Sequence, residues 1–481
     1  MKPALNRREF LECSAACGTL AASALGAGPM LAAGEGWPKP APVKIYKVYG
    51  GRTGDDYLTR PTEELGRIDK YLTDIAKKLG DVEFIGGDMI PPANVDQVAA
   101  KLKGAGAGGL LIVHLSHHGG DAPVLGKLVD VGLPTALFSQ PFSGHGWMDF
   151  PRWHKQGKQV VLLPTSDWGE LARVVALMRV PARLSQTKIL AINGPHGTAA
   201  ACSAEKVKAK LGAELVTVSN DRVMQYFKAI DPKAAEAEAE AYWISQARRI
   251  VEPKRPDIID SARMYLAVKN LMIDEKAQAI CSQACMGTPR GCLTFSKLND
   301  QGLVGACEGD IDSTLTMLMF NYAFGIPGFI SDPVIDTAKN AVVHFHCTSA
   351  TKMDGPAGKR LPFVIRTQTD SRGGVSLEVE NRVGQPVTCA KFVNLDTMLL
   401  VPGKIIETST SPLACRTQFT QSVADARRLF LNWGGDVLDA GDTMTRLHRV
   451  VFYGDYAKPM QDLSDLMKFK VVDEANPAAV V

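Results

Sequence analysis

The fold class follows first from residues 43–79, which read VKIYKVYGGRTGDDYLTRPTEELGRIDKYLTDIAKKL. The run Val43–Tyr49 is short and rich in Val, Ile and Tyr, which predicts a strand. Glu63–Leu79 instead predicts an amphipathic helix. Its apolar residues at helical spacing are Leu65, Ile68, Leu72, Ile75 and Leu79. The stretch therefore indicates a strand followed by a crossover helix.

The same alternation continues downstream. Further strand-like runs are Gly109–Leu115, Pro134–Phe138, Val160–Leu163 and Ile189–Ile192. Alternating strands and helices are typical of parallel sheets covered by helices. We therefore expect an N-terminal α/β domain over residues 43–184. A second, central α/β domain is expected over residues 185–351, with a long helix over Ala234–Ile250.

Beyond Lys352 the pattern changes to closely spaced strand-like segments. These are Phe363–Thr369, Gly374–Glu380, Cys389–Leu395 and Thr397–Val401. Short strands that follow one another without long helices between them favour a β domain. The predicted fold class is thus α/β, with two parallel-sheet α/β domains followed by a smaller, mostly β C-terminal domain over residues 352–481.

The composition is that of an ordinary globular protein. Of the 481 residues, 46% are hydrophobic and 22% are charged, which excludes disordered and fibrous classes. The length allows two or three domains, each with its own core. The formal net charge is only +3, so the chain has no electrostatic footprint for nucleic acid.

Residues 1–34 differ from the rest of the chain. Arg7 and Arg8 precede Phe10, and a weakly apolar Ala/Gly/Leu-rich stretch follows over Ala15–Ala33. This pattern is typical of a twin-arginine signal peptide with cleavage after Gly34; a frayed N-terminal helix is the alternative. We therefore expect the twin-arginine export machinery as a partner and a periplasmic or otherwise exported mature protein. No later run reaches the roughly 20 apolar residues that a membrane span needs, so we expect no stable membrane insertion of the mature protein.

Eight cysteines remain after the predicted leader is removed. An even number permits disulfides in an oxidising compartment. The spacing of Cys281, Cys285 and Cys292, however, fits neither a regular disulfide framework nor the usual zinc and iron–sulfur patterns. We expect the cysteines to be mostly small core residues.

Three segments place polar residues inside apolar surroundings, where such groups must be paired or functional. Residues 307–312 (CEGDID) open an apolar helix, and the bland explanation for Asp310 and Asp312 is helix capping. Residues 327–333 (PGFISDP) form a short apolar strand that ends in Asp332, and strand ends are where open α/β sheets place their sites. Residues 447–455 place His448 before a third apolar run. Each segment alone is a weak signal.

Their order along the chain resembles the L-fucose and L-arabinose isomerase superfamily. An acidic residue stands after a small one and before a helix, a second carboxylate follows on G-F-x-x-D, and a distant histidine precedes an aromatic-Tyr-Gly segment. The resemblance extends from about Gly302 to Val472. Its further carriers are His344–Cys347, Cys415–Gln418 and the closing helix Pro459–Met467.

In that family, two carboxylates and a histidine hold a divalent metal, usually manganese. By resemblance these ligands are Glu308, Asp332 and His448, with the carboxylates in the central domain and the histidine in the C-terminal one. Hard oxygen ligands with one imidazole suit Mn²⁺ or Mg²⁺, whereas zinc favours more nitrogen or sulfur.

The resemblance implies an aldose–ketose isomerase that acts on a pentose or a 6-deoxyhexose. Such a reaction moves a proton between adjacent carbons through an enediol, and a divalent metal stabilises the charge that develops. Glu308 and Asp332 are expected to serve as the catalytic proton-transfer groups, with Glu308 as the main base. The family's assemblies imply a homo-oligomer, a trimer or hexamer.

Four further residues are candidates for sugar binding. By resemblance His346 borders the metal. Arg52 follows the first strand and could hold a sugar hydroxyl or simply form a turn, while Gln283 and Trp433 are candidate pocket residues.

Another histidine group, His114, His117 and His118, can mimic a metal site. By resemblance it lines the pocket of a neighbouring subunit instead. Two other functions stay open at this point. One is an exported sugar-binding or sensing protein without turnover, and the other is an enediolate-forming lyase or epimerase.

Overall fold

The computed structural model describes residues 36–37, 39–51, 60–90, 94–115, 122–283, 289–368, 373–434, 437–438 and 443–476. The predicted signal peptide, residues 1–34, lies outside the described residues, as do Arg52, His117, His118 and Cys285. Among the helices of the described part of the chain, none is both long and apolar enough to traverse a bilayer.

The N-terminal domain is a parallel five-stranded sheet in the order β2-β1-β3-β4-β5. Its strands are β1 (Val43–Gly50), β2 (Val82–Met89), β3 (Gly109–His114), β4 (Thr135–Phe138) and β5 (Val160–Leu163). Its helices are α2 (Pro61–Leu79), α3 (Val95–Gly104), α4 (Ala122–Val129), η2 (Gly146–Asp149) and α5 (Phe150–Lys155). Helix α2 ends at Gly80, whose φ of 73° is the left-handed conformation that glycine adopts most readily. The predicted strand–helix alternation is confirmed, with β2 as an additional strand.

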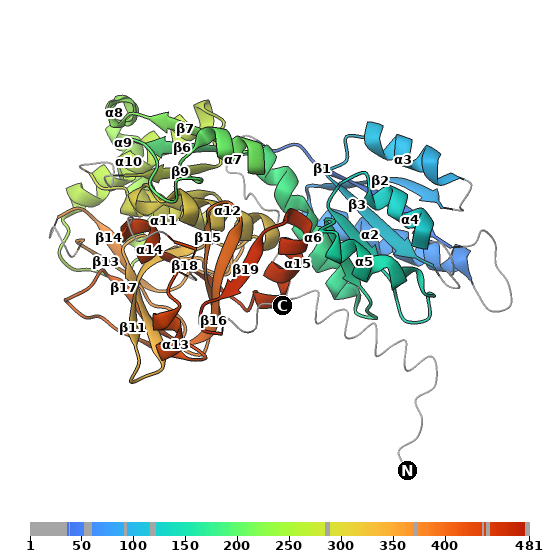
Figure 1. The fold of residues 1–481 in the computed structure, drawn as a ribbon. Coiled ribbons are helices and arrows are strands. Elements are labelled where there is room, and N and C mark those ends of the chain that lie inside the picture. Colours follow the sequence, from blue (N-terminus) through green and yellow to red (C-terminus); the bar gives the residue numbers. More distant parts are fainter. Residues whose placement is uncertain are drawn as a thin grey trace, which may run out of the picture.

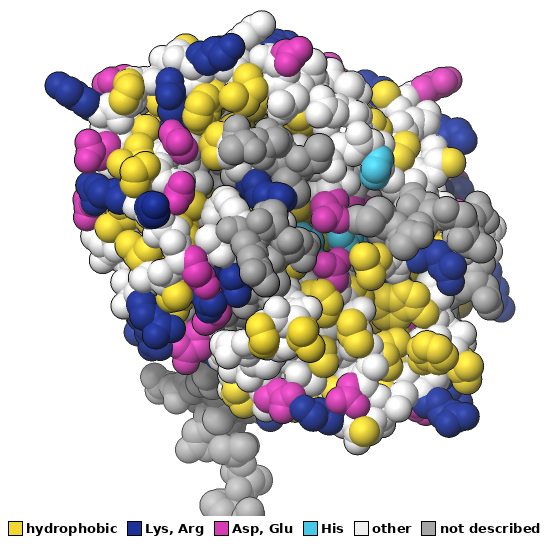
Figure 2. Space-filling view, turned by 90° about the vertical axis from the view of Figure 1, so that its left-hand side faces the viewer, with side chains coloured by type: hydrophobic (Ala, Val, Ile, Leu, Met, Phe, Trp, Pro, Cys, Tyr) yellow, Lys and Arg dark blue, Asp and Glu magenta, His cyan; other side chains and the backbone are white. Residues whose placement is uncertain are grey.

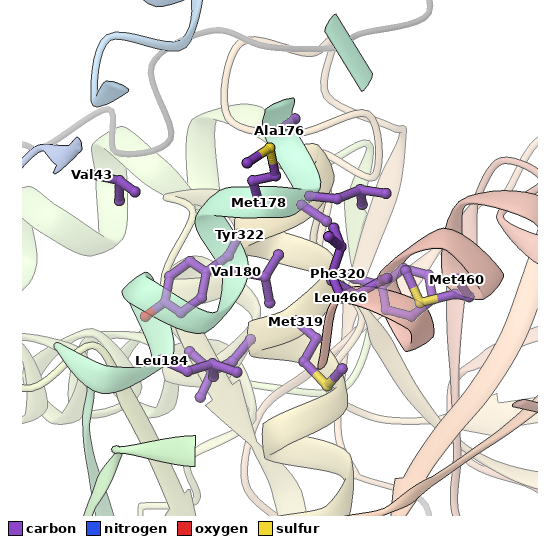
Figure 3. Close-up of a cluster of buried hydrophobic side chains, with 14 of the residues drawn as sticks. Val43, Ala176, Met178, Val180, Leu184, Met319, Phe320, Tyr322, Met460 and Leu466 are labelled. Carbon is purple, nitrogen blue, oxygen red and sulfur yellow. The ribbon is translucent and has the colours of Figure 1, made fainter. Parts of the chain in front are cut away.

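Helix α6 (Trp168–Ser185) connects the two α/β domains (Figure 1). It begins where the Asp167 carboxylate accepts a hydrogen bond from the Gly169 amide at 2.8 Å. Almost all of its faces are buried, because it packs against α12 (Ile311–Phe324) and α15 (Ala457–Met467). Figure 3 shows apolar side chains of these three helices, among them Val180, Met319 and Met460, meeting in one cluster.

The central domain holds a parallel four-stranded sheet in the order β10-β9-β6-β7. Its strands are β6 (Lys188–Ile192), β7 (Glu214–Val218), β9 (Ala279–Ser282) and β10 (Val304–Ala306). Besides α12, its helices are α7 (Ala204–Leu211), α8 (Asn220–Ala229), α9 (Pro232–Tyr242), η3 (Ile244–Gln246), α10 (Arg255–Asp274), α11 (Cys292–Asp300) and η4 (Cys307–Gly309).

The predicted helix over Ala234–Ile250 is wrong at its C-terminal end. Helix α9 stops at Tyr242, and Arg249–Ile250 form the short strand β8 instead. The reason is tertiary, since β8 pairs in parallel with β13 (Phe363–Arg366). Strand β14 (Ser376–Val379) completes this small sheet.

The C-terminal part is an antiparallel barrel of six strands. They are β11 (Phe329–Asp336), β12 (Ala341–His346), β15 (Pro386–Val393), β16 (Thr397–Thr408), β17 (Thr417–Ser422) and β18 (Arg449–Tyr453). The sheet order β15-β18-β11-β12-β17-β16 closes because β16 also pairs with β15. The remaining elements are β19 (Lys470–Asp473), which joins β16 in parallel, and the short helices α13 (Ala426–Leu431) and α14 (Thr443–Leu447).

The predicted fold class, two parallel α/β sheets followed by a β region, is confirmed. Strands β11 and β12 precede Lys352 in the chain but pair with barrel strands, so the barrel takes up part of the segment before that residue. The domain limits 43–184, 185–351 and 352–481 themselves stay predictions. Helix α12 joins the central sheet to the barrel, where Phe320 stacks on Phe452 with ring centroids 3.7 Å apart.

The described cysteines form no disulfide with one another and, apart from Cys202, are buried. This agrees with the expectation of small core residues.

Candidate active and metal site

Glu308 lies in a sharp turn at the carboxyl end of β10. Its φ of 58° and ψ of 22° are left-handed, a conformation that costs a non-glycine residue about 1–3 kcal/mol. The turn is held by backbone hydrogen bonds from His196 N to Gly309 O (2.8 Å) and from Ile311 N to His196 O (2.9 Å). The Glu308 side chain is 35% exposed, so its carboxylate can be reached from solvent.

Strand register brings Asp332 beside two histidines. In the barrel, the residue before Asp332 pairs with the residue after His448 on an antiparallel strand. The side chains of Asp332 and His448 are therefore level with each other. On its other side Asp332 pairs with Phe345 of β12, one residue before His346. The start of β11 approaches β18 closely because residue 328 is glycine, where an added Cβ would overlap Val450 and Phe452.

The three predicted metal ligands converge on one point. His448 Nε2 lies 3.3 Å from Glu308 Oε2 and 3.3 Å from Asp332 Oδ1. His346 Nε2 lies 3.9 Å from Asp332 Oδ2, and one ligand atom each of Glu308, His346 and His448 lie within 4.8 Å of one another. Figure 2 shows acidic and histidine side chains gathered near the middle of one face of the molecule. His346 therefore stands where a fourth ligand could stand.

A buried carboxylate behind His448 sets the orientation of its ring. Asp310 Oδ2 accepts a hydrogen bond from His448 Nδ1 at 3.0 Å and pairs with Lys391 Nζ at 2.8 Å. Asp310 also caps α12 through the Ser313 amide, so the predicted capping role is confirmed and a second role is added. Burial raises the pKa of Asp310, but Lys391 and His448 outweigh it and hold that pKa below its ordinary value. A carboxylate that fixes a histidine in this way is typical of metal sites.

Asp312 does not cap the helix through its side chain as Asp310 does. Both of its oxygens instead accept hydrogen bonds from Thr198, from the amide at 2.6 Å and from the hydroxyl at 2.7 Å. The contact ties the segment after β6 to α12.

The polar atoms at the point of convergence call for a cation. With Nδ1 donating to Asp310, Nε2 of His448 turns a lone pair toward two carboxylates. Within the described residues, buried Nε2 of His448 and Oδ1 of Asp332 make no hydrogen bond, although they lie within ion-pair distance. Either a proton or a metal ion at Nε2 would relieve this repulsion. The residues thus fit a divalent ion.

The pKa shifts describe the proton-bound form of the same arrangement. Burial lowers the pKa of His448, but its three carboxylate neighbours outweigh burial and raise it to about 10. The adjacent His448 imidazole lowers the pKa of Glu308 despite burial. For Asp332, burial raises the pKa, but His448 and His346 lower it further, to below its ordinary value. Both carboxylates are therefore ionised at neutral pH.

The other predicted residues are placed as follows. Gln283 follows β9 beside the Glu308 turn, and its side chain contacts the His196 ring. The Trp433 indole donates to Arg446 O at 2.7 Å, and its ring stacks under the guanidinium of Arg449, the residue after His448. His114 is buried in the N-terminal domain near Ser139 and does not join the cluster.

Two residues near the site were missed by sequence reasoning. His196 lies in an Asn-Gly-Pro-His-Gly turn directly after β6, at the carboxyl edge of the central sheet where such sites form. Lys391 stands inside the apolar strand β15, and a lysine in such a run must have a buried partner. Turn composition and burial were the signals that could have revealed them.

A cavity of about 700 Å³ lies apart from this cluster. Residues of α6 and α12 line it, among them Arg183 and Tyr322, and none of the converging ligands does.

Comparison with known proteins gives a distant, partial similarity. No family model matches the chain. A sulfoquinovose isomerase from Clostridium sp. (strain MSTE9) is 25% identical over 190 residues, which are 38% of this chain and 40% of that protein. A sulfoquinovose isomerase from Priestia aryabhattai is 28% identical over 193 residues, 37% and 41% of the two chains. The chain thus spans about two fifths of the length of the curated relatives it matches.

Among solved structures, a carbohydrate transporter from Acidothermus cellulolyticus 11B in complex with myo-inositol has a TM-score of 0.19 at 10% identity. The match covers 58% of this chain and 87% of that one. A glucose-galactose binding protein from Geobacillus stearothermophilus has a TM-score of 0.18 at 14% identity, covering 59% and 92%. At these TM-scores the likeness carries no conclusion about this chain.

Proposed function

We propose that this chain is a divalent-metal-dependent aldose–ketose isomerase. The observation that carries the proposal is the convergence of two ionised carboxylates and two imidazoles on one partly open point. The distant similarity to sulfoquinovose isomerases supports the same reaction class.

Glu308, Asp332 and His448 would hold the metal, with His346 as a fourth ligand. Two hard oxygen donors together with imidazole suit Mn²⁺ or Mg²⁺. When bound, such an ion supplies Lewis-acid stabilisation of the negative charge that develops on the sugar oxygens. Asp310 positions His448 so that Nε2 faces the carboxylates.

Glu308 is the proposed proton carrier. Isomerisation removes a proton from the carbon next to the carbonyl and returns one to the neighbouring carbon, while a second proton changes oxygen. Glu308 is ionised at neutral pH and more exposed than Asp332, 35% against 20%, so it can reach a bound sugar as a base. Asp332 would carry the second proton, between the oxygens.

The proposed substrates are pentoses and 6-deoxyhexoses, and the names of the relatives add sulfoquinovose to the sugars worth testing. The test is aldose-to-ketose conversion by residues 35–481 with Mn²⁺, followed by chromatography and by exchange of the substrate C2 proton with deuterated solvent.

Glu308→Gln should abolish both conversion and exchange. Glu407→Gln, which alters an exposed ion pair with Lys339, is the matched control and should leave both unchanged. No conversion of any sugar by a metal-loaded protein would refute the isomerase. Sugar binding without exchange would then indicate a sensing or transport protein, and exchange without ketose would indicate an epimerase or lyase.

We also propose that residues 1–34 direct export through the twin-arginine machinery and that the mature protein is a homo-oligomer outside the cytoplasm. The Arg7-Arg8 pair ahead of a weakly apolar stretch supports export. A reporter fused after residue 40 should leave the cytoplasm only with both arginines intact. Export of the double-lysine variant would contradict the proposal. Light scattering of the mature protein tests the oligomer.

A further inference from the structure

Three cysteines from distant parts of the chain lie close to one another beside the carboxylate site. They come from the start of α11, from η4 and from the position directly after β12. They are Cys292, Cys307 and Cys347, each at most 2% exposed. Cys347 is central, because its thiol contacts those of Cys292 and Cys307.

The geometry around Cys347 is that of a compact ligand set. Cys347 Sγ lies 3.5 Å from Cys292 Sγ and 3.5 Å from His346 Nδ1. One ligand atom each of Cys307, His346 and Cys347 all lie within 4.8 Å of one another.

We propose that Cys307, Cys347 and His346 form a second metal site for a thiophilic ion, Zn²⁺ or Cu⁺, with Cys292 as the fourth ligand. In a tetrahedral zinc site with bonds of about 2.3 Å to sulfur and 2.0 Å to nitrogen, neighbouring sulfurs stand roughly 3.8 Å apart and sulfur and nitrogen roughly 3.5 Å apart. The separations of Cys347 Sγ from Cys292 Sγ and from His346 Nδ1, both 3.5 Å, are close to these values. Cys307 lies within 4.8 Å of His346 and Cys347, so it needs a shift of at most about 1 Å to complete the three-ligand set, and Cys292 would have to turn toward the ion as the fourth ligand.

The donor set selects a different ion from the one proposed for Glu308. Thiolate sulfur favours Zn²⁺ and Cu⁺, whereas carboxylate oxygen favours Mn²⁺ and Mg²⁺. Each thiol that binds must release its proton to solvent, so uptake of the ion should acidify a weakly buffered solution. This site does not depend on the proposed isomerase function.

His346 connects the two sites. Its Nδ1 faces Cys347, while its Nε2 lies 3.9 Å from Asp332 Oδ2. When an ion occupies Nδ1 of a neutral imidazole, the ring proton stays on Nε2. His346 would then donate to Asp332 instead of serving as a ligand beside Glu308, so that loading of the thiol site changes the ligand set of the other.

The test uses Co²⁺ as a spectroscopic probe on reduced protein, residues 35–481, in the absence of oxygen. Thiolate ligands give Co²⁺ an intense near-ultraviolet charge-transfer band that oxygen and nitrogen ligands do not give. We expect one equivalent of Co²⁺ with this band in the unaltered protein and in Glu308→Gln, displaced by Zn²⁺ but not by Mn²⁺.

Cys347→Ser and Cys307→Ser should lose the band. Cys389→Ser, an equally buried cysteine in β15, is the matched control and should keep it. If a cluster variant does not fold, X-ray absorption of the zinc-loaded unaltered protein decides, with sulfur expected at about 2.3 Å from zinc. Cobalt bound without the band, zinc without sulfur neighbours, or a Cys292–Cys347 disulfide in the protein as isolated would each overturn the proposal.

Discussion

Replacement of Asp310 by asparagine should disturb two of its roles at once, which are to neutralise Lys391 and to orient His448. The substitution keeps an oxygen that can cap α12 through Ser313, so the capping contribution is expected to survive. It removes the carboxylate that pairs with Lys391 Nζ at 2.8 Å, and both side chains are at most 1% exposed. Loss of one partner from a buried ion pair destabilises by about 3–5 kcal/mol.

The same substitution should weaken metal binding. Asp310 is the acceptor for His448 Nδ1 at 3.0 Å, and loss of such a partner behind a metal ligand lowers metal affinity about 10- to 100-fold. That factor corresponds to about 1.4–2.7 kcal/mol of binding free energy. Urea unfolding of chelator-treated protein measures the first effect, and Mn²⁺ titration calorimetry measures the second.

A double variant separates the two effects. Lys391→Met added to Asp310→Asn removes the unpaired buried charge, so it should recover most of the stability while Mn²⁺ affinity stays low. An Asp310→Asn protein that binds Mn²⁺ within twofold of the unaltered chain would refute the positioning role. A double variant as unstable as the single one would refute the charge argument.

Three other predictions concern stability. Burial lowers the pKa of His344 to about 3. As the pH falls, the imidazole is therefore protonated first in the unfolded chain, near pH 6.5. The stability that this group contributes is present above pH 6.5 and falls as the pH drops toward 3. This loss of unfolding free energy should reach about 2 kcal/mol by pH 5. It should be missing from the pH profile of His344→Gln, and identical pH profiles of urea unfolding for the two proteins would contradict it. Hydrogen bonding from Arg366 lowers the pKa of Glu252 to about 2, so its stabilisation is present above pH 4.5 and lost as pH falls toward 2. Solvent screening limits the cost of Glu252→Gln to about 1 kcal/mol at pH 7, and an unchanged urea midpoint at pH 7 and at pH 3 would exclude this contribution. Phe320→Ala should lower the free energy of unfolding in urea by about 3–5 kcal/mol, because it leaves a cavity where the Phe320 ring stacks on Phe452 between α12 and the barrel. A loss below 1 kcal/mol would show that neighbouring side chains fill this cavity.

Local patterns predicted the fold class and many of its elements. The strands Val43–Tyr49 and Val160–Leu163 and the helix Glu63–Leu79 were found because their periodicity directly reflects which face is buried. Strand β2 was missed because its side chains after Val82 are mostly half-exposed and two glycines interrupt it. The helix predicted up to Ile250 failed because pairing with β13 overrode local propensity.

The candidate ligands came from the sequence only as weak motifs in a familiar order. That order, and the residue types that suit a hard cation, are properties of the chain itself. Their meeting is a property of the folded barrel, because the register of β11 against β18 sets which residue faces His448 across more than a hundred positions of sequence. The same holds for Asp310 behind His448 and for the thiols around Cys347, whose spacing along the chain shows no pattern. Burial pattern is encoded locally and so can be predicted from neighbouring residues, whereas contacts between distant segments depend on how strands pair and helices pack, which only the tertiary structure decides.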